Sequence, residues 1–202
     1  MKKFIILAAI VLAAAIGLHA QTDTLALSYT TPDYADPFLK NLCELQNVSQ
    51  LGVTVSGKSL NGRKLIYRCH RVLNGSPSIV VETPKATTVK SDSIRLILGA
   101  RPINSDSVFI ALEGPVLFKS GIAVATDRRI LMETYSAHPV TVNDTIPVMA
   151  YTTGIPRRMN FDGKTMEVTH YCGLRDACVH PLEWYEKYGI KDFIYYDVIF
   201  LP

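Results

Sequence analysis

The chain has 202 residues, of which 48% are hydrophobic and 19% are charged, and its formal net charge is +3. This length suits one ordinary domain with a sizeable core. The basic residues form no block, since Arg128-Arg129 and Arg157-Arg158 are isolated pairs, so the sequence gives no indication of a nucleic-acid partner.

The N-terminus carries the features of a cleavable secretory signal. Lys2 and Lys3 precede an uninterrupted apolar run over residues 4–17, and small residues follow it. The run is shorter than the roughly 20 residues that span a bilayer. We therefore expect a signal peptide over residues 1–20, a single globular domain over residues 21–202 and no stable membrane span, in a periplasmic or secreted protein.

The first predicted helix begins at Asp36-Pro37. Asp is a preferred N-cap residue, and Pro suits the first helical position because its missing N–H would be unpaired there anyway. Four residues then recur with helical spacing and share one face: Leu39, Leu42, Cys43 and Gln46. We expect this face to pack against the core of the domain.

Strands are predicted for most of the remaining chain. Short runs rich in β-branched and aromatic residues alternate with clusters of Gly, Pro, Asn, Asp and Ser. The predicted strands cover residues 51–55, 63–69, 78–82, 93–98, 107–112, 122–126, 129–135 and 164–171.

Two tight hairpin turns are expected, at Asn61-Gly62 and at Asp162-Gly163, because these dipeptides tolerate positive φ at both central positions. The second turn also fixes a register. It pairs Phe161 with Lys164, Met159 with Met166 and Arg158 with Glu167. An apolar pair and an opposite-charge pair both support that register.

The C-terminal part is predicted to contain a second helix that begins at Pro181 and is capped by Gly189, followed by a last strand over residues 192–200. Strands joined mostly by hairpins, with a helix near each end, indicate an α+β domain built mainly on antiparallel β-sheet. A β-sandwich with added helices is the alternative.

The even number of cysteines points to disulfides, because an exported chain meets an oxidising compartment. Cys172 and Cys178 are closest in sequence and are expected to pair across a short loop. This leaves Cys43 to pair with Cys69, since the helix face and the strand face that carry them are both expected to meet the core.

The stretch from His170 to His180 also has the composition of a metal site. If both arms are extended, Cys172 lies opposite Cys178 and His170 lies opposite His180, which would suit a tetrahedral zinc ion. Disulfide formation is the favoured interpretation and would leave the His170/His180 pair as the candidate metal ligands. Alternatively, Pro181 draws His180 into the start of the helix.

Aromatic residues are concentrated near the C-terminus. We expect these side chains to form part of the hydrophobic core. Trp184, Tyr185 and Tyr188 could instead form an exposed surface that stacks on an envelope glycan or contacts a protein partner.

A short pattern of Asp, then a hydroxyl residue, then an aliphatic residue occurs four times, at 23–25, 92–94, 106–108 and 144–146. The pattern resembles the O-glycosylation sequon of exported Bacteroidetes-type proteins, and turn-to-strand junctions also produce it. The resemblance makes Thr24, Ser93, Ser107 and Thr145 candidate glycosylation sites. In the general style of its sequence, the chain also resembles exported Bacteroidetes-type domain families of unknown function.

Catalytic motifs such as H-E-x-x-H and G-x-S-x-G do not occur in the sequence. We therefore expect no cofactor and a non-enzymatic binding or structural role at the cell envelope. An envelope hydrolase whose site is assembled from distant residues is the alternative. A metal-binding protein centred on His170 and His180 is a weaker one.

Overall fold

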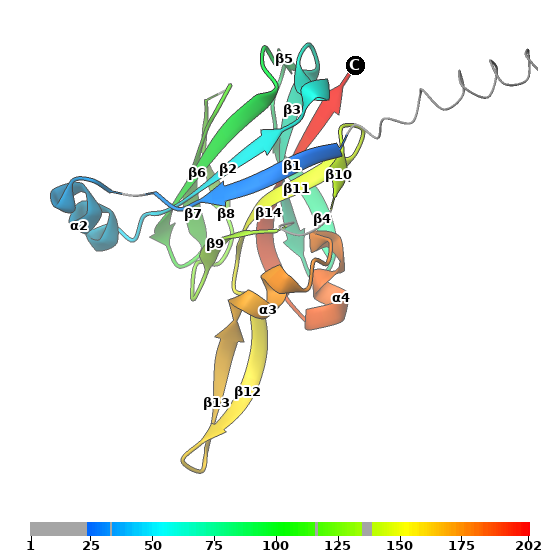
Figure 1. The fold of residues 1–202 in the computed structure, drawn as a ribbon. Helices are drawn as coiled ribbons and strands as arrows, with labels where there is room; N and C mark the ends of the chain where they lie inside the picture. Colours follow the sequence, from blue (N-terminus) through cyan, green and yellow to red (C-terminus); the bar gives the residue numbers. More distant parts are fainter. Residues whose placement is uncertain (1–23, 33, 116, 135–138) are drawn as a thin grey trace, which may run out of the picture.

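The computed structural model describes residues 24–32, 34–115, 117–134 and 139–202 (Figure 1). The expected signal peptide over residues 1–20 lies outside the described residues. Strands make up 56% of the structure and helices 15%, so the prediction of a mainly antiparallel β-sheet protein is confirmed. Within the described ranges, no helix has the length and apolar character needed to cross a membrane.

Two antiparallel sheets form the body of the protein. The first has the order β10-β1-β2-β6-β7-β8. Its strands are β10 (Val140–Thr141), β1 (Thr24–Thr30), β2 (Ser49–Ser56), β6 (Ser93–Asn104), β7 (Ser107–Glu113) and β8 (Phe118–Ala123). The second has the order β4-β3-β14-β11-β9, and β5 also pairs with β3. Its strands are β4 (Ser76–Glu82), β3 (Lys64–Leu73), β14 (Asp192–Leu201), β11 (Thr145–Thr152), β9 (Ile130–Glu133) and β5 (Thr87–Thr88).

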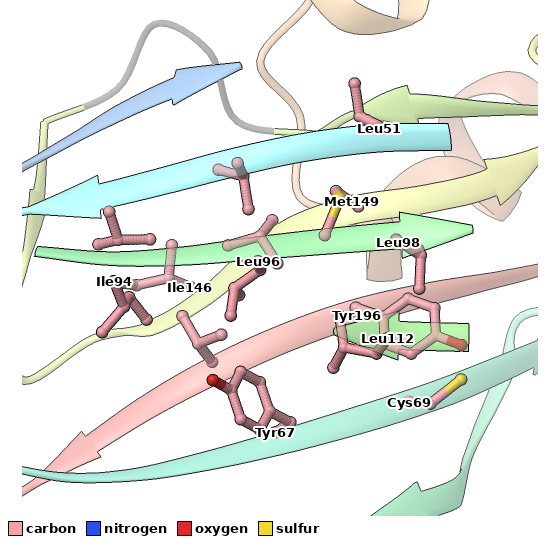
Figure 2. Close-up of a cluster of buried hydrophobic side chains, with 14 of the residues drawn as sticks. Leu51, Tyr67, Cys69, Ile94, Leu96, Leu98, Leu112, Ile146, Met149 and Tyr196 are labelled. Atoms are coloured by element: carbon pink, nitrogen blue, oxygen red, sulfur yellow. The ribbon is translucent and has the colours of Figure 1, made fainter. Parts of the chain in front are cut away.

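The two sheets pack face to face around one hydrophobic core, as in the β-sandwich alternative (Figure 2). Side chains of a strand alternate between its two faces, and in β6 every second residue from Ile94 to Ala100 is buried. Figure 2 shows Leu96 and Leu98 of the first sheet near Ile146 and Tyr196 of the second.

A second, smaller core covers the outer face of the second sheet. Two short helices supply buried side chains to it, α3 (Tyr171–Asp176) and α4 (Trp184–Tyr188), and the 3₁₀ turn η2 (Pro181–Glu183) lies between them in the chain. The second sheet is therefore buried on both faces along β14, which explains why this strand is almost continuously apolar.

One of the two predicted hairpin turns is confirmed. The strands β12 (Ile155–Phe161) and β13 (Lys164–His170) pair in the expected register, and Asp162 and Gly163 both have positive φ. The other prediction is wrong. Asn61-Gly62 follows the 3₁₀ turn η1 (Lys58–Leu60) and connects β2 to β3, which belong to different sheets. A hairpin with positive φ at both positions occurs instead at Asn74-Gly75, between β3 and β4.

The predicted start of the first helix and the predicted end of the second are confirmed, whereas the second helix begins as the 3₁₀ turn η2 at Pro181 and continues as α4 only from Trp184. In α2 (Pro37–Leu45) the Asp36 carboxylate accepts a hydrogen bond from the Phe38 backbone N–H at 2.9 Å. Gly189 caps α4 in the left-handed conformation. The expected burial of the first helix is wrong, because α2 has no buried residue and extends away from the sandwich (Figure 1).

Candidate functional site

The stretch from His170 to His180 contains a helix, not the two extended arms expected. The His170 Nδ1 accepts a hydrogen bond from the Gly173 N–H at 3.1 Å and caps α3. The His180 Nδ1 accepts from the Leu182 N–H at 3.2 Å and caps η2, so Pro181 does draw His180 into a helix start. Across the described parts of the chain, no group of three or more His, Cys, Asp or Glu side chains is arranged to hold a metal ion.

The expected disulfides are not found, because no bond joins Cys43, Cys69, Cys172 or Cys178. Cys172 lies in the first turn of α3 and Cys178 follows its last turn. Cys178 has a positive φ of 49°, so it lies outside the helix, and its thiol contacts the Arg175 carbonyl at 3.8 Å. Helix α2 places Cys43 outside the core, whereas the Cys69 side chain lies inside it.

The chemistry of Cys69 follows from its burial between the sheets. Burial raises the pKa of the Cys69 thiol to about 12. Because the thiolate is the reactive form of cysteine, this side chain is chemically inert in the folded protein.

The C-terminal aromatic residues are core rather than an exposed surface. Trp184 is 1% exposed, its Nε1–H donates to the Val179 carbonyl at 2.8 Å, and its ring centroid lies 5.1 Å from that of Phe193. Tyr185 and Tyr188 are half-buried beside it. The expectation that these residues supply core thus holds for Trp184, and the alternative of an exposed stacking surface centred on it does not.

The structure brings together His70 and Asp197, which the sequence did not single out. His70 lies on β3 and Asp197 on β14, and the His70 Nε2 is 2.7 Å from the Asp197 Oδ2. The His70 ring stacks on Tyr195 with a centroid separation of 4.6 Å, and the His180 ring meets the same tyrosine edge-on at 6.2 Å. No local motif could have revealed this pair, because 127 positions separate the two residues.

Burial dominates the electrostatics of this cluster. Burial lowers the pKa of His180, with a further lowering from His70, against opposing effects of Glu183 and Asp197. A neutral His180 is also what its role as a hydrogen-bond acceptor at Nδ1 requires. Asp197 is 3% exposed, and its Oδ1 has no hydrogen-bond partner among the described residues. The cluster thus has the composition of an acid–base site but lies within a packed layer.

A polar clamp joins the loop after β8 to the start of β14. The Asp192 carboxylate accepts hydrogen bonds from the Arg71 Nε–H at 3.0 Å and from the Ala125 N–H at 3.1 Å. The Arg129 guanidinium lies 3.6 Å from the same carboxylate. Burial lowers the pKa of Arg129, whereas Asp192 raises it. These contacts hold the loop after β8 against the start of β14.

A cavity of about 410 Å³ lies between β1, β2, β9 and α3. Its volume falls in the range of small-molecule pockets, roughly 300–1,000 Å³. Cys172 and Arg175 line it together with apolar side chains such as Leu51. The Arg175 guanidinium pairs with Asp176 and Glu133, at 2.9 and 3.3 Å, so its charge is already balanced.

The β12–β13 hairpin projects from the sandwich beyond α3 (Figure 1). From Pro156 to Glu167 every residue is exposed. The register places three apolar side chains on one face, and Met159, Phe161 and Met166 are 56%, 75% and 54% exposed. We call this surface the apolar hairpin face. Arg157 and Lys164 lie on the same face, and Arg158 and Glu167 lie on the opposite one.

The candidate glycosylation residues share one structural position. Ser93 of β6, Ser107 of β7 and Thr145 of β11 are each the first residue of a strand, and Thr24 is the first described residue of β1. Each following aliphatic residue is buried: Leu25, Ile94, Val108 and Ile146. Thr24, Ser93 and Thr145 are exposed and Ser107 is half-buried. For Ser93, Ser107 and Thr145 the pattern thus coincides with the start of a strand, and the Thr24, Ser93 and Thr145 side chains are exposed.

Of these features, the apolar hairpin face is the one that leaves large apolar side chains more than half exposed. The His70–Asp197 pair and the Asp192 clamp have structural partners, and the cavity beside α3 has a balanced charge. Comparison with protein-family models, with curated proteins and with solved structures finds no match for this chain.

Proposed function

We propose that this chain is an exported, non-enzymatic binding module of the cell envelope, in which the sandwich is the scaffold and the β12–β13 hairpin is the binding element. The exposure of the apolar hairpin face carries the proposal. Large contiguous apolar surfaces are rare on monomeric proteins and mark sites of interaction. The secretory features of residues 1–20 support a periplasmic or secreted location.

The stability of the hairpin gives a second argument. An isolated two-stranded hairpin is marginally stable in water and needs a third strand or a packed face. Within the described residues, β12 and β13 pair only with each other. A partner that covers the apolar hairpin face would supply the missing packing.

The test is a variant in which residues 157–168 are replaced by a short Gly-Ser linker. We expect the variant to keep the melting temperature of the parent, because the hairpin lies outside both cores. We also expect it to lose co-sedimentation with cell envelopes of the native host. Ile79→Asp, which changes a similarly exposed apolar residue of β4, is the matched control and should bind as the parent does.

The proposal fails if the linker variant sediments with envelopes as well as the parent. It also fails if the variant unfolds at a much lower temperature, because the hairpin would then be a structural element of the domain.

The His70–Asp197 pair supports a second candidate, an envelope hydrolase. A carboxylate bound to an imidazole is the orienting half of a catalytic triad. We favour the binding module because Asp197 and Tyr195 are almost fully buried, which suits a brace between β3 and β14. Hydrolysis of activated esters that is abolished by His70→Gln would favour the enzyme.

A further inference from the structure

The β12–β13 hairpin is open along both of its edges in the described chain, because each strand pairs only with the other. A two-residue hairpin alternates residues whose N–H and C=O groups point inward with residues whose groups point outward. Phe161 and Lys164 flank the turn and form a pair whose N–H and C=O groups point inward. Along the hairpin, residue pairs whose groups point outward alternate with such inward pairs. The outer edge of each strand is therefore a template for another strand.

The two edges are not equal. On β13 the outward positions are Thr165, Glu167 and Thr169, and each offers both an N–H and a C=O. On β12 they are Asn160, Arg158 and Pro156, and Pro156 has no N–H. The β13 edge is thus the more complete template for an added strand.

The charges beside the apolar hairpin face define what can cover it. Arg157 and Lys164 lie on this face, whereas the acidic Glu167 lies on the opposite face. Two copies stacked through this face would bring like charges together, which is unfavourable. The face therefore suits a partner that is both apolar and acidic.

An anionic lipid surface would meet the charge requirement but not the backbone requirement. Open sheet edges are not tolerated in a hydrocarbon layer, because their N–H and C=O groups lose their hydrogen bonds to water. Asp162 at the turn would also be the first charge to reach an anionic membrane. A peptide strand, in contrast, pairs with the backbone of the edge and places its own side chains beside Lys164 and Met166 of the face.

We propose that the partner is an extended segment of another protein, which adds an antiparallel third strand to the β13 edge, with an acidic side chain beside Lys164 and an apolar one beside Met166. Strand addition of this kind draws its affinity from main-chain hydrogen bonds and its selectivity from alternate side chains. The inference rests on the proposed function of the hairpin and names the partner class of that same site.

The experiment is selection of a random-peptide display library on the intact protein. We expect the enriched peptides to alternate apolar and polar residues and to carry Asp or Glu. In synthetic versions of these peptides, N-methylation of the alternate amides that face β13 should abolish binding, whereas N-methylation of the amides that face away should not.

A charge exchange tests the register. Lys164→Glu should weaken the binding of the acidic peptides about fivefold, which is the upper range for the loss of one exposed cross-strand ion pair. The same peptides with Lys in place of the acidic residue should bind the Lys164→Glu protein better than the parent. Lys164→Arg is the matched control and should retain the acidic peptides.

The outcomes separate the two proposals. Peptides that bind equally to the linker variant would overturn the role of the hairpin itself. Peptides that need the hairpin but are rich in Lys or Arg, or that tolerate every N-methylation, would overturn only the strand-addition inference. Sedimentation with phosphatidylglycerol vesicles but not with phosphatidylcholine vesicles would overturn it in favour of a membrane. A dimer mass that Met159→Asp abolishes would overturn it in favour of a second copy.

Discussion

His70 and Asp197 join β3 to β14 on the outer face of the second sheet, with the imidazole Nε2 2.7 Å from a carboxylate that is almost fully buried. Two segments 127 positions apart in the sequence are thus linked beneath the layer formed by η2 and α4, in addition to the Arg71–Asp192 contact between the same two strands. The contact has direct consequences for stability.

Removal of the imidazole should destabilise the protein. His70→Ala leaves the Asp197 carboxylate buried without its partner, so we expect the free energy of unfolding in urea to fall by about 2–4 kcal/mol. Arg101→Ala, at an exposed position of β6, is the control and should cost less than about 0.5 kcal/mol. A loss for His70→Ala as small as that of the control would show that the contact contributes little.

His180 should make the stability depend on pH. Because the pKa of His180 is lowered in the folded state from its usual 6.5, the unfolded chain binds the proton more tightly. The contribution of neutral His180 is therefore complete above about pH 6.5 and is lost as the pH falls from there toward the folded pKa.

We expect urea unfolding at a series of pH values between about 7 and 5 to show this loss in the parent. His180→Asn keeps an acceptor for the Leu182 N–H but cannot titrate, so its stability should fall less steeply over the same range. Equal slopes for the two proteins would exclude His180 as the source.

How much of this could be predicted from the sequence depends on whether a signal is local. The β12–β13 register and the caps at Asp36 and Gly189 are local, and all three are confirmed. Strand β11 was missed because Pro147 interrupts its pattern, and the structure has a bulge at that point.

The errors arise where distant parts of the chain compete. Asn61-Gly62 has the composition of a hairpin turn, but β2 and β3 pair with β6 and β14 instead of with each other. The alternation around Cys172 looks like a strand, yet the His170 cap starts a helix there. His70 and Asp197 become neighbours only through the β3–β14 register, which no local pattern fixes.

The Asn74-Gly75 turn gives a comparison between two glycines of similar conformation. Gly75 and Gly163 have φ of +80° and +77°, and a Cβ is strained at both. A Cβ at Gly75 would also lie 2.6 Å from the Tyr185 ring, whereas a Cβ at Gly163 would meet open space.

Gly75→Ala should therefore lower the melting temperature more than Gly163→Ala. We expect about 2–3 kcal/mol for Gly75→Ala, from strain plus the clash. We expect almost no loss of global stability for Gly163→Ala, because its strain is confined to the hairpin outside both cores. Calorimetry of the two variants measures the difference. A loss of only about 1 kcal/mol for Gly75→Ala would mean that Tyr185 moves aside without cost.

The cysteines should differ sharply in reactivity. Iodoacetamide should label the exposed Cys172 in the native protein, whereas the buried Cys69 should react only after unfolding. Mass spectrometry of peptides from native and denatured samples distinguishes the two. In the denatured, unreduced protein all four thiols should be labelled, and a protein that keeps any pair unlabelled would contain a disulfide.

Glycosylation is expected where a hydroxyl group is both preceded by Asp and accessible. Thr24, Ser93 and Thr145 meet both conditions, whereas the Ser107 hydroxyl is half-buried and donates a hydrogen bond to the Asn104 Oδ1 at 2.8 Å. Protein from the native host should therefore be heavier than recombinant protein. The excess mass should shrink with Ala at any of the three exposed positions but not with Ser107→Ala.

The control for this prediction is Thr165→Ala, which removes an exposed hydroxyl on β13 that follows a Lys. Its excess mass should equal that of the parent, because an exposed hydroxyl group that no Asp precedes is not expected to be glycosylated. Identical masses of host and recombinant protein would mean that the four patterns only mark turns leading into strands. In that case the buried residues Leu25, Ile94, Val108 and Ile146 would explain them fully, since each strand needs an inward aliphatic side chain directly after its first residue.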